Sequence, residues 1–129
     1  MAQKSPPLPS FAELDILKTL WRLGPSTVRE VRDALGKNNT YTTTLKQMQL
    51  MLEKGLLRRT ERYRTHVYEP ETPKQQLQQR IAGDVLQRAF EGSAKDLVLG
   101  ALAAQPATDA ELIEIRGLLN RLRKERRTR

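Results

Sequence analysis

The feature that most constrains the fold is a short motif that occurs three times, a serine or threonine followed three residues later by a glutamate. In this capping box the hydroxyl accepts a hydrogen bond from the third backbone N–H of a helix, and the glutamate accepts one from the N–H of the capping residue itself. Each box therefore marks where a helix begins. The three pairs are Ser10 with Glu13, Thr27 with Glu30, and Thr108 with Glu111.

Glycine and proline mark where the first three helices end. Gly24-Pro25 closes the first helix and Gly36 the second. A third helix is expected over residues 40–54, with Gly55 at the left-handed position that follows many helices. Apolar residues at helical spacing are expected to face the core. They are Phe11, Leu14, Leu17 and Trp21; then Val28, Val31 and Leu35; then Leu45, Met48 and Leu52.

A different pattern follows Gly55. The segment LLRRTERYRTHVYEP is rich in Thr, Tyr and Val, and its two halves flank a charged tip at residues 62–64. It predicts a two-stranded hairpin, although the tip lacks the Asn-Gly or Asp-Gly pair typical of tight hairpins. Three helices followed by a hairpin is the order of a winged helix-turn-helix, in which the third helix enters the DNA major groove.

Helical signals resume after Pro73 and continue towards the C-terminus. Ser93 with Asp96 begins a further short helix, and the third capping box begins the last one. The apolar residues of that last helix are spaced three, four and three, which is typical of a helix that packs against another helix. They are Leu112, Ile115, Leu119 and Leu122. The fold class is therefore mainly α-helical, a winged helix-turn-helix followed by a C-terminal helical region.

The charge favours a polyanionic partner. Lys and Arg number 23 against 15 Asp and Glu, a net charge of +8. Nucleic acid is the first candidate and an anionic membrane surface the second, while a soluble basic protein with no such partner is the alternative. The longest apolar run, residues 97–104, is too short to span a bilayer, and the N-terminus lacks the apolar core of a secretory signal. A cytoplasmic protein with no membrane partner is expected.

The sequence indicates neither a metal site nor an enzyme. It contains no cysteine and one histidine, which excludes thiolate ligation and a histidine-rich metal cage. There is no glycine-rich phosphate loop, no Gly-x-Ser-x-Gly and no His-Glu-x-x-His motif. No cofactor is expected. His66 is interpreted as a strand residue that faces a neighbour.

The start of the third helix carries the candidate chemistry. In a helical projection Thr43, Lys46, Gln47 and Leu50 lie opposite the apolar stripe, with Thr42 at the edge. Hydroxyl, ammonium and amide groups hydrogen-bond to base edges and phosphates. An ordinary solvated face capped by Thr40 is the alternative. The basic hairpin tip, with Arg62 and Arg64, favours the DNA interpretation. Tyr63 at that tip is equally compatible with packing on a sugar and with filling a turn position.

Several segments together resemble the penicillinase-repressor family of the BlaI/MecI/CopY type. They are ELDILKTLWRLGPSTVREVRDAL, YTTTLKQMQLMLEKGLLRR and RTHVYEP, and GSAKDLVLGAL resembles that family's dimerisation segment. The resemblance implies a homodimeric transcriptional repressor, with one winged helix on each half of a palindromic double-stranded DNA operator. It aligns Thr40, Thr42, Thr43, Lys46 and, in the wing, Arg64 with the family's DNA-contacting positions.

The resemblance also implies a division of the chain. Residues 8–71 would form the winged-helix DNA-binding domain and residues 72–126 the helical dimerisation domain, with 1–7 and 127–129 disordered. The dimer interface is expected to include Leu97 and Leu102 together with Leu112, Ile115, Leu119 and Leu122. A protein-interaction module built on a winged helix, and a non-specific DNA-binding protein, are the alternative functions.

The sequence departs from the family at four points. Leu50 stands where relatives tend to carry arginine, and Tyr63 replaces the usual glycine of the wing tip. Relatives that control β-lactam resistance have an inactivating protease as a partner and are cleaved at an Asn-Phe bond. Gly100 and Ala101 occupy that point here, which argues against the same induction. The copper-responsive branch carries paired cysteines, and this chain has none.

Overall fold

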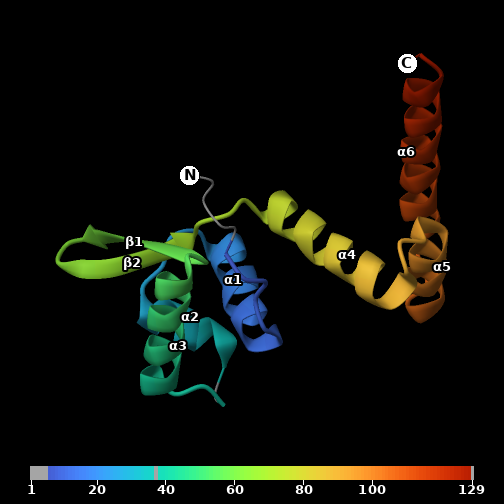
Figure 1. Cartoon of the computed structure of the whole chain (residues 1–129). Coiled ribbons are helices and arrows are strands. Elements are labelled where there is room, and N and C mark those ends of the chain that lie inside the picture. Colours follow the sequence, from blue (N-terminus) through green and yellow to red (C-terminus); the bar gives the residue numbers. More distant parts are fainter. Residues whose placement is uncertain (1–5, 37, 129) are drawn as a thin grey trace. The chain divides into compact units, whose positions relative to one another are not determined.

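The computed structural model describes residues 6–36 and 38–128 and confirms the predicted fold class. Three helices, a two-stranded hairpin and three further helices follow one another along the described chain (Figure 1). Contacts divide the chain into two compact units, Met1–Gly83 and Asp84–Arg129. The elements are α1 (Phe11–Leu23), α2 (Val28–Leu35), α3 (Tyr41–Lys54), β1 (Leu57–Arg62), β2 (Thr65–Pro70), α4 (Lys74–Phe90), α5 (Ala94–Ala104) and α6 (Asp109–Arg127).

The caps lie where the sequence predicts them. In the first box Ser10 Oγ accepts from the Glu13 N–H at 3.2 Å, and Glu13 Oε1 accepts from the Ser10 N–H at 2.9 Å. Thr27 and Glu30 form the same reciprocal pair at the start of α2. At α6 the structure shows one half of the third box, in which Thr108 Oγ1 accepts from the Glu111 N–H. Gly55 adopts the predicted left-handed conformation after α3, with φ of 83°.

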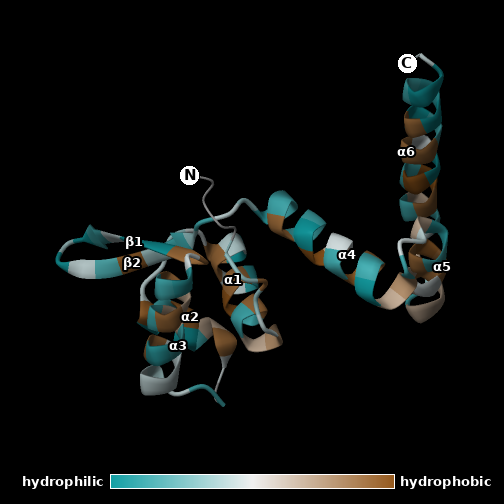
Figure 2. Cartoon of the chain, in the orientation of Figure 1, coloured by the Kyte–Doolittle hydropathy of each residue, from teal (hydrophilic) through white to brown (hydrophobic). Residues whose placement is uncertain are grey.

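The core of the first unit lies between α1, α2, α3 and the hairpin, and it also takes in the start of α4. Figure 2 shows the apolar residues of these elements as brown segments on the ribbon. The buried cluster consists of Ile16, Leu17, Leu20, Val28, Val31, Met48, Met51, Leu56, Leu57, Tyr68 and Leu77.

One predicted core position, Phe11, needs correction. Phe11 is 91% exposed, because the buried side of α1 is the one that carries Ile16, Leu17 and Leu20. Phe11 precedes the buried Glu13 by two residues, and two residues turn a helix by about 200°, so the ring points away from the core. In α3 the fully buried apolar residues are Met48 and Met51, while Leu45 and Leu52 pack against the cluster only partly buried.

The hairpin is held to the helices by backbone hydrogen bonds. Its strands pair antiparallel from Leu57 opposite Pro70 to Arg62 opposite Thr65. Ser26, in the loop between α1 and α2, donates to the Tyr68 carbonyl at 3.0 Å and accepts from the Tyr68 N–H at 2.8 Å. This isolated bridge ties β2 to the loop between α1 and α2 and so sets the hairpin beside the helices.

The first half of α4 packs with the winged helix. Leu77 is buried in its core and Ile81 packs against that core. Arg80 donates to the carbonyl of Pro6 at 2.7 Å. The compact unit therefore extends past the functional boundary that we propose at residue 71.

The two ends of the chain, residues 1–7 and 127–129, were expected to be disordered. At the C-terminal end Arg127 is the last residue of α6 and Thr128 follows it. Residues 1–5 and 129 lie outside the described part of the chain.

One buried carboxylate joins the beginning of α1 to the end of α3. Besides capping α1, Glu13 accepts a hydrogen bond from Lys54 Nζ on its second oxygen at 2.8 Å. Burial raises the pKa of the Glu13 carboxyl, but the hydrogen bonds from Lys54 and Ser10 outweigh it and leave that pKa below its ordinary value. The charged form is therefore the one that the fold stabilises.

Replacing Glu13 by glutamine tests this arrangement. A carboxyl whose pKa is lowered by folding stabilises the fold above its unfolded pKa and loses that effect as the pH falls through its folded pKa. We expect Glu13→Gln to lower the free energy of unfolding at pH 7 by about 1–2 kcal/mol. The difference from the unsubstituted chain should shrink below roughly pH 4. Urea unfolding at a series of pH values measures it, with the exposed Glu53→Gln as the matched control. An equal loss at pH 7 and pH 3 would contradict the charge-dependent role.

Candidate nucleic-acid interface

The threonines at the start of α3 divide into structural and exposed ones. Thr40 is the N-cap, and its Oγ1 accepts from the Thr43 N–H at 3.1 Å. Thr44 is buried, and its hydroxyl donates to the Thr40 carbonyl at 2.8 Å. Thr42 and Thr43 are exposed. Thr43 Oγ1 also accepts a hydrogen bond from Thr40 Oγ1 at 2.9 Å, which leaves the Thr43 hydroxyl hydrogen available for an outside acceptor.

The exposed side of α3 carries most of the residues predicted to read DNA. Lys46 and Leu50 are exposed on the same helix as Thr42 and Thr43. Gln47 is half-buried and lines a depression on the α1 side, together with Asn39 and Lys74 among others. The structure thus brings Thr42, Thr43 and Lys46 together on the exposed side and turns Gln47 partly towards the body of the unit.

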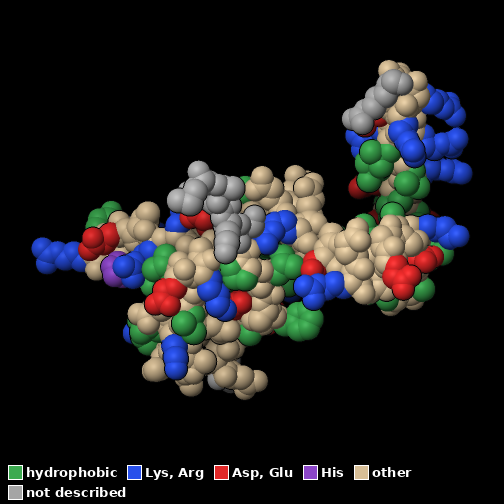
Figure 3. All heavy atoms as spheres, in the orientation of Figure 1, with side chains coloured by type: hydrophobic (Ala, Val, Ile, Leu, Met, Phe, Trp, Pro, Cys, Tyr) green, Lys and Arg blue, Asp and Glu red, His purple; other side chains and the backbone are tan. Residues whose placement is uncertain are grey.

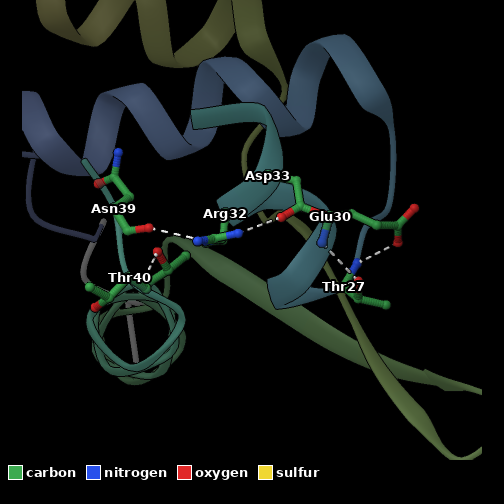
Figure 4. Close-up of polar contacts among 7 residues, drawn as sticks. Thr27, Glu30, Arg32, Asp33, Asn39 and Thr40 are labelled. Atoms are coloured by element: carbon green, nitrogen blue, oxygen red, sulfur yellow. Dashed lines mark hydrogen bonds and ion pairs between the residues drawn. The ribbon is translucent and has the colours of Figure 1, made fainter. Parts of the chain in front are cut away.

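The turn that leads into α3 is held from α2. Arg32 donates through Nε to the Asn39 carbonyl at 3.1 Å and pairs with Asp33 Oδ1 at 3.0 Å (Figure 4). Asn39 directly precedes the Thr40 cap. The position of the first turn of α3 therefore depends on a guanidinium that belongs to the preceding helix.

The two predicted wing arginines have different surroundings. Arg62 lies 3.5 Å from Glu30, at the start of α2. Hydrogen bonds from Thr27 hold the pKa of the Glu30 carboxyl below its usual range, with a smaller contribution from Arg62, so this carboxylate stays charged. Arg64 instead lines a groove with residues of α2, α3 and the hairpin. Figure 3 shows basic side chains at the outer part of the hairpin.

That groove, which we call the wing groove, is basic. Its volume is about 460 Å³, and it lies where the start of α2, one side of α3 and the hairpin meet. None of its lining residues is acidic. The Arg29 guanidinium stands 5.8 Å from the centroid of the Tyr41 ring, a cation–π arrangement that orients the arginine. The lining residues are Thr27, Val28, Arg29, Tyr41, Leu45, Gln49, Arg59, Arg64, Thr65, His66 and Tyr68.

Three residues of the wing groove were not predicted as site residues from the sequence: Arg29, Arg59 and Tyr41. The alternation of side chains along a strand could have predicted the position of Arg59, because neighbouring residues of a strand point to opposite faces. Arg58 is opposite Glu69 and pairs with it at 2.7 Å, which places Arg59 on the other face. For Arg29 and Tyr41 no local signal exists, because their contact joins two helices.

The second unit carries the residues predicted to form a dimer interface. Among its described residues, 84–128, none is buried. Leu112, Leu119 and Leu122 are 44–53% exposed along α6, and Leu97, Leu102 and Ile115 are half-buried. Gly100 lies under Phe90, since a Cβ at Gly100 would stand 3.4 Å from the Phe90 ring. An asparagine at that point would have to displace the ring.

Two further findings concern metals and membranes. Within residues 6–36 and 38–128, no group of three or more His, Asp or Glu side chains is placed to hold a metal ion. In the same residues, no helix combines the length and the apolar character that crossing a bilayer requires.

Comparisons with known proteins agree on one family. The family model described as penicillinase repressor matches residues 9–121. A penicillinase repressor of Bacillus licheniformis is 26% identical over 118 residues, which cover 90% of this chain and 92% of that protein. The solution structure of monomeric Bacillus licheniformis BlaI in complex with the blaP half-operator is 26% identical, with a TM-score of 0.49, and the match covers 56% of this chain and 90% of that one. Since the family model spans both units, the chain belongs to the penicillinase-repressor family.

Proposed function

We propose that this chain is a transcriptional repressor that binds a palindromic operator as a homodimer and reads its sequence with α3. Membership of a family of DNA-binding repressors supports the general function. The observation that carries the proposal is the exposed face of Thr42, Thr43 and Lys46 next to a groove that is lined by arginines and by no acidic residue. A polar helix face beside a basic wing is the arrangement that winged helices use on DNA.

The site residues fall into two roles. Thr42, Thr43 and Lys46 would contact base edges in the major groove, with Gln47 at the margin of that contact. Thr40 caps the start of α3, where free N–H groups of the first turn favour a phosphate. Arg62 and Arg64 in the wing, joined by Arg29 and Arg59 in the wing groove, would bind backbone phosphates.

The dimer is supported by the second unit. Leucines at a spacing of three, four and three remain about half exposed on a helix whose unit has no buried residue among those described. Burial of one such side chain contributes roughly 1.5–3 kcal/mol. A second copy offers the same apolar stripe, and a two-fold dimer would place the two α3 helices on successive turns of DNA. We expect no cleavage between Gly100 and Ala101 of the kind that inactivates β-lactam-responsive relatives, because the Asn-Phe pair is absent.

Lys46→Ala tests sequence reading. The operator is first identified by selecting bound sequences from random DNA. A base-edge contact contributes about 1–3 kcal/mol of discrimination, so the variant should bind the operator roughly tenfold more weakly while its affinity for random DNA changes little. Fluorescence anisotropy measures both affinities, and Lys18→Ala on the exposed side of α1 is the matched control. Equal losses on both DNAs would make Lys46 a phosphate contact. Failure to select any palindrome would favour a non-specific DNA-binding protein or a protein-interaction module.

Arg59→Met tests the wing groove. Loss of one phosphate contact should weaken operator and random DNA binding alike and reduce the slope of log affinity against log salt by about one. Arg58→Met is the matched control, because Arg58 is already paired with Glu69 on the other face of the strand. An unchanged salt slope in the Arg59 variant, or the same reduction in the Arg58 variant, would contradict the assignment.

Removal of the residues after Gln105 tests the dimer. Without α6 the chain should be monomeric at micromolar concentration and bind the operator far more weakly, since one half-site contact replaces two. Sedimentation equilibrium measures the association state. In the full chain Leu119→Glu should have the same effect, and Ile113→Glu, outside the 112/115/119/122 spacing, should leave the dimer intact. A truncated protein that stays dimeric would refute the assignment of α6.

A further inference from the structure

The wing tip keeps a tyrosine where the backbone favours glycine. Tyr63 and Arg64 form the two-residue turn between β1 and β2, with φ angles of 51° and 65°. Two consecutive positive φ angles in a two-residue hairpin loop are the pattern of a type I′ turn, which asparagine and glycine adopt readily. A tyrosine in this region is strained, because its Cβ approaches the neighbouring backbone.

Nothing within the described fold compensates that strain. Tyr63 is 95% exposed, so its ring buries almost no apolar surface. A glycine or an asparagine at this position would serve the hairpin better. Backbone strain that does not contribute to the stability of the fold is often found where a residue contacts a partner.

The surroundings of the ring identify the partner. Arg62 precedes Tyr63 and Arg64 follows it, so the exposed ring belongs to a basic segment of the chain. Arg64 also lines the wing groove together with Tyr41 and Gln49 of α3, which places this end of the hairpin and the reading helix on one face of the unit. An aromatic ring in a basic segment suits a surface on which apolar sugar edges alternate with phosphates. The DNA minor groove is such a surface.

We propose that Tyr63 packs its ring against deoxyribose in the minor groove beside the base pairs that α3 reads, while Arg62 and Arg64 bind the adjoining phosphates. This inference rests on the proposed function, since it requires an operator. Proteins that bind the minor groove commonly place apolar side chains in it beside basic ones. Tyr63 would then increase the affinity for the operator. It would also favour particular flanking sequences, because the width of the minor groove depends on the DNA sequence.

Tyr63→Gly separates this role from a structural one, because the two predict opposite effects. The variant relieves the strained turn, so its midpoint of thermal unfolding should equal or exceed that of the unsubstituted chain. Its affinity for the selected operator should nevertheless fall about tenfold. Tyr63→Phe keeps the ring and should retain the affinity, while Tyr63→Asn tolerates the turn without an aromatic ring and should behave like the glycine variant.

Hydroxyl-radical footprinting on the purified protein and operator locates the contact. The unsubstituted chain should protect the sugars that flank each half-site. In the Tyr63→Gly variant the loss of this protection should be the only change in the footprint. Unchanged affinity and footprint in the glycine variant would overturn the proposal and would point to a protein partner for the ring. A fall in thermal stability of the glycine variant would also overturn it, since Tyr63 would then support the hairpin. If the unsubstituted chain bound no specific sequence, the proposed function itself would fail.

Discussion

Burial of one side of α3 is the constraint on which the rest of the interface depends. Thr44, Met48 and Met51 are fully enclosed by the other elements of the first unit. A helix has only one orientation that buries these three, and that orientation presents Thr42, Thr43 and Lys46 to solvent. A buried hydroxyl is tolerated at Thr44 because it donates to the Thr40 carbonyl. The backbone N–H of Thr44 donates to the same carbonyl at 3.0 Å and closes the first turn of the helix.

Arginine has two distinct uses in the first unit. Arg32 and Arg58 pair with carboxylates of the same unit and hold the turn before α3 and the hairpin. Arg62 lies 3.5 Å from Glu30, but its side chain is 53% exposed, which leaves it open to the phosphate contact that we propose. Exposed pairs of this kind contribute little to stability, so their main effect is on geometry. Arg29, Arg59 and Arg64 line a groove without acidic residues, where their charge is available to an anion. Net charge alone does not reveal this division, because all six count equally in the total.

The two units differ in how they bury apolar surface. The first encloses a core of its own. The second leaves leucines exposed along α6, although α5 and α6 begin at the expected capping residues Ser93 and Thr108. Helices of this length gain most of their stability from packing rather than from propensity. The homodimer that we propose would cover these side chains, because a second copy offers the same apolar residues at the same three-four-three spacing.

The sequence by itself determined where the helices begin and end and where the hairpin turns. Ser10, Thr27 and Gly55 act through hydrogen bonds and dihedral angles within a few residues, so their effect is present in the local sequence. The tertiary structure alone decided that Ile16 and Leu20 rather than Phe11 face the core. It also decided that Arg29, Tyr41 and Arg59 share one groove with Arg64. Burial and side-chain proximity between elements depend on which neighbour covers each helix, and spacing along one helix carries no record of that neighbour.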